Sequence, residues 1–527
     1  MRAVLVPSFA LLLASCASPA PAEPAPEPST ASAAIAPAPP IAITPPAAAP
    51  SVAAPIAIPP PGRRIYAKTR FVWVHYEPNA TSGWLGFLWL GGYADVKGDG
   101  PVQGGPGCNA WYAVEPRGFV CADGSGATTD ADDPVLRALR PFAPDLSSPW
   151  PHHYGESRSA ERYREIPSEK DQRAREWELV EHRAHLAELR EGKTHPSVEG
   201  VDLTPGDSEP LVLPTLPSTL REQRRRMLPL STVAWSRDVL AGDRSFLLTA
   251  DLMFVPKDRV APYPRSDFAG VVLGDGGETL PLAFFRGKAR PKHRLGDDGA
   301  MIADGEWPRL AHVGLTGESR DVGGQRYLAT REAGLFVLAS DATVVKARDA
   351  TPWGAPMGEA DASGKGPGGR QTWLDASILG GWLVAYEGTR AVYATLISPG
   401  RGGLPEKGKD EISTASTPVG SWPISGKFAT ATMVAPGEFI HSDVPWTQNF
   451  HGPHALHAAY WHDAFGEKKS AGCINVSPID GKWLYDWTEP RLPAGWHGIR
   501  FEPGLGPATW IFVHSLPRRR ATAETRC

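Results

Sequence analysis

One cysteine in the C-terminal part of the chain, Cys473, stands among residues whose types suit nucleophilic catalysis. It follows Ser470, Ala471 and Gly472, and His457 lies a short distance upstream. A thiol is mostly protonated at neutral pH, so a catalytic cysteine needs a neighbouring imidazole or dipole to expose the thiolate. Gly472 would let a substrate approach the backbone, and neighbouring amides could form an oxyanion hole. The segment predicts acyl transfer through Cys473, with a histidine as its base.

The same segment holds three further histidines: His451, His454 and His462. They leave two other interpretations of Cys473 open. Histidines three residues apart could bind zinc from one side of a helix, with the cysteine as fourth ligand, although Gly452 and Pro453 disfavour a regular helix there. Alternatively, the cysteine is inert and packs as a small hydrophobe.

These residues resemble the catalytic motif of the L,D-transpeptidase domain, also called the YkuD family. That motif has a histidine, a spacer, and then Ser/Thr-His-Gly-Cys followed by an apolar residue and Arg or Asn. Here it reads His457 and then Ser-Ala-Gly-Cys-Ile-Asn over residues 470–475. Two more segments are similar to the family, Thr-Pro-Val-Gly-Ser-Trp at 417–422 and Tyr-Trp-His-Asp-Ala-Phe-Gly at 460–466. The resemblance spans residues 370–513.

The resemblance implies that Cys473 attacks the carbonyl between a diamino acid and a terminal D-alanine in a peptidoglycan stem peptide, giving a thioester. His457 would take the thiol proton and later assist the incoming amine, and neither a metal nor an organic cofactor is needed. Ser470 and the amide of Gly472 would stabilise the loop or the oxyanion. The residues expected to contact the substrate or orient the loop are Tyr460, Trp461, His454 and Asn475.

The motif departs from the family at one position. Ala471 stands where the family keeps a second histidine. Reduced or differently tuned activity follows from that change, and a non-catalytic peptidoglycan-binding envelope lipoprotein is a further reading. An L,D-carboxypeptidase that uses water as acceptor would need the same catalytic residues.

The elements that must position these residues are mostly β. Strands are expected at 373–378, 382–386 and 391–398, joined by Gly-Gly and Glu-Gly turns. A helix is expected over Pro478–Trp487, with Trp483, Leu484 and Trp487 on one face. The resemblance implies a β-sandwich of L,D-transpeptidase type.

Upstream of this domain, three segments read as weak copies of one β-hairpin: 111–120, 246–255 and 327–337. They resemble SH3-like modules, small β-barrels of exported cell-wall proteins. Between the first two copies, Ser168 and Asp171 resemble a capping box that opens one amphipathic helix ending at Arg190. The stripe expected to face the core consists of Ala174, Trp177, Val180, Ala184 and Ala187.

The N-terminus reads as a secretion signal rather than a structural helix. Residues 13–16, Leu-Ala-Ser-Cys, resemble the bacterial lipobox, which makes Cys16 the expected lipidation site. By resemblance to Gram-negative lipoproteins, Ala17 favours an anchor in the outer membrane, facing the periplasm. Export permits disulfides, and Cys108 and Cys121 could bridge. A net charge of −4 gives no indication of a nucleic-acid partner, and nothing indicates the oligomeric state.

The expected organisation therefore begins with a lipoprotein signal peptide (1–16) and a Pro/Ala-rich tether (17–61). An SH3-like β module (62–125), a helix-containing linker region (126–225) and further SH3-like β modules (226–365) follow. The L,D-transpeptidase catalytic domain (366–516) and a basic tail (517–527) complete the chain.

Overall fold

The computed structural model describes residues 11–12, 63–124, 126–209, 211, 213–214, 227–228, 230–274, 277–353, 371–435, 439–502 and 506–515. Strands far outnumber helices, so the predicted mostly β class is confirmed. No sheet among these residues closes into a barrel, and the small barrels expected upstream are not found there. Cys16, the tether and the basic tail lie outside the described residues. Of the expected signal peptide, only the short strand β1 (Leu11–Leu12) is described.

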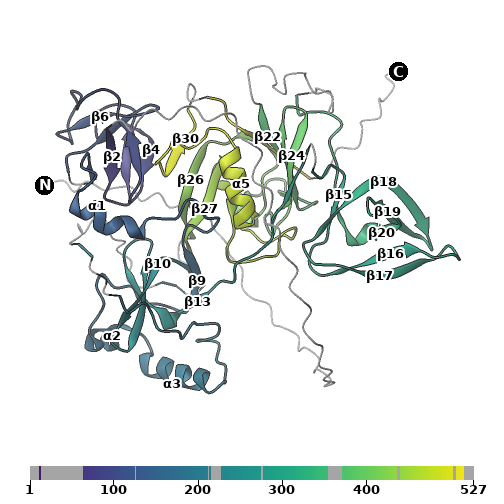
Figure 1. Cartoon of the computed structure of the whole chain (residues 1–527), viewed down its shortest axis with the longest axis horizontal. Coiled ribbons are helices and arrows are strands. Elements are labelled where there is room, and N and C mark those ends of the chain that lie inside the picture. The colour runs from purple at the N-terminus through teal and green to yellow at the C-terminus, as the bar shows by residue number, and fades with distance from the viewer. Residues whose placement is uncertain are drawn as a thin grey trace.

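The expected catalytic domain (366–516), here called the catalytic region, is built mainly from two sheets that face each other (Figure 1). One has the order β14-β24-β23-β22-β31-β25. Its strands are β14 (Val271–Val272), β22 (Thr372–Ser377), β23 (Trp382–Glu387), β24 (Arg390–Leu396), β25 (Gly420–Pro423) and β31 (Trp510–His514). The three strands expected from the sequence correspond to β22, β23 and β24, and are confirmed.

The second sheet of this region contains β26 (Gly426–Ala435), β27 (Phe439–His451), β28 (His454–Ala458), β29 (Ile474–Val476) and β30 (Gly498–Arg500). A shared core joins the two sheets, with Leu374 and Leu383 from one and Leu456 and Ile474 from the other, all fully buried. The short helix α4 (Glu411–Thr414) lies in the connection before β25. Burial of this apolar area is the main favourable term that holds the sheets together.

The predicted helix is present as α5 (Pro478–Trp487) and completes this core. The side chain of Ser477 caps its first turn by accepting the amide of Asp480, and Pro478 occupies the first turn, where no amide is needed. Leu484 is buried in the shared core. Gly481 faces Ala458, because a β-carbon on Gly481 would lie 2.8 Å from that of Ala458. The glycine therefore lets α5 lie close against β28.

Four strands of the N-terminal region extend the second sheet, and three others form a small sheet of their own. The sheet continues from β30 to β4, β3, β7 and β6. The strands of this region are β2 (Arg64–Ala67), β3 (Val72–His75), β4 (Trp84–Leu88), β5 (Tyr93–Asp95), β6 (Trp111–Ala113), β7 (Phe119–Cys121) and β8 (Ala127–Thr128). The expected hairpin at 111–120 is confirmed as β6 and β7. The Cys108–Cys121 disulfide forms, as the sequence allowed.

A third sheet, here called the accessory sheet, packs beside the catalytic region with the order β12-β11-β10-β9-β13. Its strands are β9 (His153–Ser157), β10 (Thr232–Ala241), β11 (Arg244–Thr249), β12 (Phe254–Pro256) and β13 (Val260–Pro262). The second expected hairpin is confirmed as β11 and β12. The helix α1 (Pro134–Leu139) lies between the N-terminal region and this sheet (Figure 1).

The single helix expected over 168–190 is wrong. The chain forms α2 (Glu169–Arg175) and α3 (Leu179–Arg190), separated where Glu178 takes a left-handed conformation with φ of 51°. Ser168 caps α2 as expected. The expected buried stripe faces solvent, with Trp177 66% and Val180 72% exposed. Tertiary contacts outweigh the apolar pattern, because the buried Glu176 forms an ion pair with Arg259 of the accessory sheet's β12–β13 connection.

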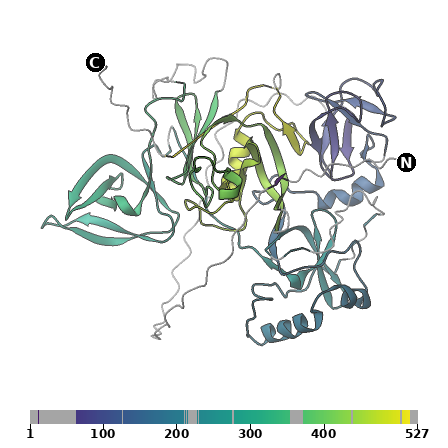
Figure 2. The same ribbon diagram turned by 180° about the vertical axis from the view of Figure 1, so that it is seen from behind.

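A further sheet projects from the other side of the catalytic region (Figure 2). Its order is β17-β16-β20-β19-β18-β15-β21. The strands are β15 (Leu282–Phe284), β16 (Arg290–Leu295), β17 (Met301–Trp307), β18 (His312–Val322), β19 (Gln325–Thr330), β20 (Leu335–Leu338) and β21 (Thr343–Val345). The third expected hairpin is confirmed as β19 and β20. Within the described part of the chain, no helix has the length and apolar character needed to cross a membrane.

Candidate active site

Cys473 lies at the point where the catalytic loop enters β29. Strands β28 and β29 pair in parallel, with His457 opposite Asn475. Side chains alternate along a strand, and Ile474 points into the shared core, so Cys473 and Asn475 point to the other face. His457 lies on that same face, and the thiol of Cys473 packs against Ala455. Parallel pairing therefore places the expected nucleophile and base on one face of neighbouring strands.

Ser470 holds the loop before the cysteine in a closed turn. Its hydroxyl donates to the carbonyl of Cys473 at 2.5 Å and accepts the amide of Gly472 at 3.1 Å. The amide of Arg401 donates to the carbonyl of Ser470 at 2.8 Å, which fixes the loop to the segment after β24. In this structure the Gly472 amide, expected at an oxyanion hole, is engaged by Ser470.

His457 has a defined tautomer. Its Nδ1 lies 3.1 Å from the carbonyl oxygen of Ala458, which can only accept, so Nδ1 carries the proton. Nε2 therefore presents a lone pair, as a general base requires. Burial lowers the pKa of His457 to about 4, with the hydrogen bond to Ala458 opposing that shift. The imidazole is neutral at physiological pH.

The thiol of Cys473 is also neutral at rest. Burial raises its pKa to about 11, and a backbone hydrogen bond with Ala455 opposes that shift. Only 2% of the residue is exposed. A cysteine and a histidine that are both neutral need not form a thiolate–imidazolium pair in advance. Proton transfer from Cys473 to His457 can instead accompany attack on a substrate.

His454 approaches the catalytic loop from β28. Its Nδ1 donates to the carbonyl of His451 at 3.2 Å, so its Nε2 is an acceptor. That Nε2 is buried and has no hydrogen-bond partner among the described residues. Burial lowers the pKa of His454, which keeps the ring neutral. The imidazole thus lies against Gly472 as a neutral ring with an unused lone pair.

Asn475 contacts a histidine rather than open space. Its Nδ2 donates to Nε2 of His462 at 3.1 Å, and its backbone pairs with Ser398. Burial lowers the pKa of His462 to about 4. This contact is consistent with an orienting role for Asn475. Its predicted contact with substrate stays a prediction.

Tyr460 and Trp461 follow β28 on the side of the accessory sheet. Tyr460 is 4% exposed, and its ring stacks on that of Tyr154 with centroids 3.8 Å apart. Trp461 is partly exposed, and its ring centroid lies 5.8 Å from that of His457. Their contacts with substrate stay predictions.

One residue of this neighbourhood had no signal in the sequence. His441 of β27 stacks on Trp461, with centroids 4.1 Å apart and planes 8° apart. Burial lowers the pKa of His441 to about 3, and the nearby His457 and His462 lower it further. The antiparallel pairing of β27 with β28 brings His441 beside the segment that follows β28. His441 lies outside the motif in sequence, so the motif alone does not indicate that it lies near the site.

The segments that resembled the family converge on the loop. The hydroxyl of Thr417 accepts the amide of Gly400 at 2.8 Å, and Gly400 bridges to Ser470. The neighbouring carbonyl of Ser416 faces Gly472. Ala471 of the same turn is partly exposed. Segments 417–422 and 470–475 are therefore parts of one site.

The zinc alternative is not supported by the ligand geometry. Among the described residues, the potential ligand atoms that converge belong to Cys108, Cys121 and Asp123, and the two sulfurs are joined in the disulfide. The histidines of the site do not converge with Cys473 in this way.

Comparison with family models finds one match within this region. Residues 373–496 match the family model described as the YkuD L,D-transpeptidase catalytic domain. No curated protein matches the chain.

Solved structures that resemble part of the chain include three L,D-transpeptidases. One from Xylanimonas cellulosilytica is 19% identical, covers 28% of this chain and 63% of that chain, and has a TM-score of 0.20. The C442S mutant from Enterococcus faecium is 18% identical, covers 27% and 50%, and has a TM-score of 0.20. One from Mycobacterium tuberculosis is 17% identical, covers 48% and 95%, and has a TM-score of 0.21. The chain thus spans less than two thirds of the first two, and the assignment rests on the family match.

Proposed function

We propose, from the premise that residues 373–496 are an L,D-transpeptidase catalytic domain of the YkuD family, that this chain transfers peptidoglycan stem peptides through Cys473. The observation that carries the proposal is the placement of Cys473 and His457 on one face of the paired strands β28 and β29. Nε2 of His457 is the nitrogen that carries a lone pair, because Nδ1 donates its proton to the carbonyl of Ala458.

The proposed first step forms a thioester. The sulfur of Cys473 attacks the carbonyl carbon that joins a diamino acid to the terminal D-alanine, while the thiol proton passes to Nε2 of His457. The bond from that carbon to the D-alanine nitrogen then breaks, and the proton leaves with the amine. Because both catalytic groups are neutral at rest, the proton transfer accompanies the attack.

The proposed second step releases the stem peptide. An acceptor amine attacks the thioester carbon, His457 takes the amine proton, and the carbon–sulfur bond breaks as the proton returns to Cys473. One amide is exchanged for another, so no oxidant, metal or nucleotide is consumed. Water in place of the amine gives the L,D-carboxypeptidase reaction with the same residues.

The proposed location is the periplasmic side of a Gram-negative outer membrane, with Cys16 lipidated. The support is the signal-like N-terminus and the Cys108–Cys121 disulfide, which fits an oxidising compartment. Labelling of the expressed chain with a palmitate analogue, compared with C16A, tests this location. Absence of label on the exported wild-type chain would contradict it.

Acylation by a carbapenem tests the catalytic proposal. The strained lactam carbonyl is an acyl donor, and ring opening keeps all of its atoms on the sulfur. Intact-mass spectrometry is expected to find one carbapenem mass on the wild-type chain, mapped to Cys473 by peptide analysis. C473A is expected to gain none, and H457Q to react at least about tenfold more slowly. A folded wild-type chain that gains no mass would contradict the proposal.

The acceptor is tested with a tetrapeptide stem. Incubation of the chain with the stem, with and without a second stem that carries a free amine, is followed by mass spectrometry of the products. A crosslinked dimer is expected. Release of D-alanine without crosslinks would instead identify water as the acceptor.

A further inference from the structure

A closed ring of hydrogen bonds joins the accessory sheet to the catalytic region. The amide of Ser442 donates to Oγ1 of Thr232 at 2.8 Å, and the hydroxyl of Tyr460 donates to the carbonyl of Ser442 at 2.7 Å. A carbonyl oxygen can only accept, so the Tyr460 proton is committed there. The contact of 2.5 Å between Thr232 and Tyr460 then requires Thr232 to donate. The ring runs from Ser442 to Thr232, to Tyr460, and back to Ser442.

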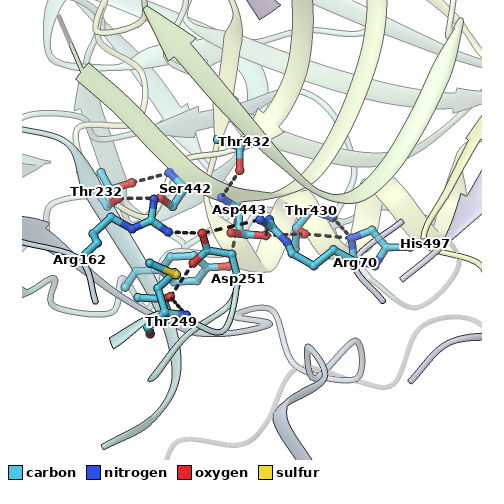
Figure 3. A network of polar contacts seen from close by, with 12 residues as sticks. Arg70, Arg162, Thr232, Thr249, Asp251, Thr430, Thr432, Ser442, Asp443 and His497 are labelled. Carbon is cyan, nitrogen blue, oxygen red and sulfur yellow. Dashed lines mark hydrogen bonds and ion pairs between the residues drawn. The ribbon is translucent and has the colours of Figure 1, made fainter. Parts of the chain in front are cut away.

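Each member of the ring comes from a different element. Thr232 begins β10 of the accessory sheet, Ser442 lies on β27, and Tyr460 follows β28. The Ser442 hydroxyl also donates to the Thr232 carbonyl at 2.8 Å, and Figure 3 shows this double contact between Thr232 and Ser442. Thr232 is fully buried. In a buried site such hydrogen bonds strengthen one another. Removing one hydroxyl leaves the donor and acceptor groups that it contacted without a partner.

The residues next to Ser442 and Tyr460 in sequence lie beside His457, the proposed base. His441 precedes Ser442, and Trp461 follows Tyr460. The rings of His441 and Trp461 stack on each other at 4.1 Å, and Trp461 lies 5.8 Å from His457. The hydrogen-bond ring therefore holds the two backbone segments whose aromatic side chains form the wall beside His457.

Charged residues hold the accessory sheet at this junction (Figure 3). Arg70 of the N-terminal region lies 3.8 Å from both Asp251 and Asp443, and Arg162 forms an ion pair with Asp251. Burial alone would raise the pKa of Asp251, but Arg162 and Arg70 lower it to about 2. The position of Thr232 relative to β27 is thus fixed by contacts from three parts of the chain.

We infer that Thr232, which lies outside the catalytic domain, is a positioning residue for the acyl-transfer reaction. Its hydroxyl closes the ring with Ser442 and Tyr460 and thereby fixes the wall formed by His441 and Trp461 beside His457. The accessory sheet acts in this reaction by supplying that hydroxyl. This inference rests on the proposed function for its chemistry.

The test compares T232V, which keeps the branched shape but lacks the hydroxyl, with T232S, which keeps the hydroxyl. S157A is the matched control, because Ser157 carries a buried hydroxyl on the same sheet, and that hydroxyl accepts the amide of Ala160 in the loop after β9. For each full-length variant, the rates of Cys473 acylation by a carbapenem and alkylation by iodoacetamide are measured by peptide mass spectrometry. The melting temperature is recorded beside both rates.

We expect T232V to slow both reactions about tenfold or more, because small displacements of a catalytic group are costly. T232S and S157A are expected to react within about twofold of the wild type, and Y460F is expected to match T232V. The double variant T232V/Y460F should be no slower than either single variant, since one loss already opens the ring.

Three outcomes would overturn the inference: wild-type rates in T232V, failure of T232S to restore the rate, or fully additive effects in the double variant. Alkylation does not require an acyl donor. If the wild type is alkylated but not acylated, the proposed function fails, and the alkylation rates still decide the role of Thr232.

Discussion

The Nε2 atom of His454 lies 3.0 Å from the position that a β-carbon on Gly472 would take, and the carbonyl of Ser416 lies equally close. Gly472 also has φ of +128°, a conformation that side chains rarely adopt. The residue before Cys473 is therefore restricted by close neighbours on two sides and by its own backbone conformation. Glycine at this position is required by the packing of the loop against His454.

The first prediction follows from this confinement. G472A is expected to displace the loop and to slow carbapenem acylation of Cys473 at least about tenfold, because strain and a clash both act on the residue beside the sulfur. The measurement is the acylation rate by mass spectrometry. G388A is the control, since Gly388 also has positive φ, +58°, but no atom lies within 4 Å of its would-be β-carbon. Wild-type acylation in G472A would contradict the prediction.

The second prediction concerns the pH dependence of acylation. His457 must be deprotonated to act as base, and burial lowers its pKa to about 4. As pH falls through about 4, the imidazole gains a proton and the rate should fall. Between pH 5 and 9 the base stays neutral and the thiol, with pKa raised to about 11, stays protonated, so the rate should be nearly constant. An acid midpoint near 6.5, the ordinary histidine value, would show that the base is solvated instead.

Local patterns predicted the parts of the fold that local forces determine. The hairpin of β6 and β7 and the helix α5 form where alternation, a serine cap and a proline at the first turn favour them. The break at Glu178 was not predictable, because it depends on the burial of Glu176 against Arg259, far away in the chain. The continuation of the catalytic sheet through the pairing of β30 with β4 is equally distant in sequence.

The site divides in the same way. The predicted residues His457, Ser470 and Cys473 are close in sequence, and the parallel pairing of β28 with β29 brings them together in space. Their catalytic roles stay predictions. His441 and Thr232 carry no motif. His441 lies near the site because β27 pairs with β28, and Thr232 because the accessory sheet packs against β27. No local sequence pattern indicates either arrangement.

The third prediction concerns acid stability at the junction. His152 is 4% exposed, and burial lowers its pKa to about 4. The pKa of His152 in the folded protein is below the unfolded value near 6.5. The neutral ring therefore contributes fully to the free energy of unfolding above about pH 6.5, and this contribution is lost as the pH falls toward 4. H152F removes this group, and its free energy of unfolding should fall less steeply over that window, by about 1.4 kcal/mol per pH unit. Urea titrations at pH 7, 6, 5 and 4.5 measure the slope, and equal slopes in both proteins would contradict the prediction.

The fourth prediction concerns the helix α5, which lies against β28. Lys427 of β26 is fully buried, and its Nζ donates to the carbonyls of Tyr485 at 2.5 Å and Thr488 at 2.9 Å, at the C-terminal end of α5. A cation there satisfies carbonyls that have no partner within the helix and interacts favourably with its dipole. K427M keeps the side-chain length but leaves both carbonyls without this donor.

K427M is expected to lower the free energy of unfolding by about 2–3 kcal/mol, the cost of buried polar groups that lose their partner. K409M is the matched control, because Lys409 forms an ion pair with Glu406 at the surface and its loss should cost less than about 0.5 kcal/mol. Chemical denaturation followed by tryptophan fluorescence measures both variants. Equal stability of K427M and K409M would show that other groups satisfy the end of α5 without the lysine. A loss in K427M alone would establish Lys427 as the cap that holds α5 against β28, where Gly481 packs against Ala458, the residue after His457.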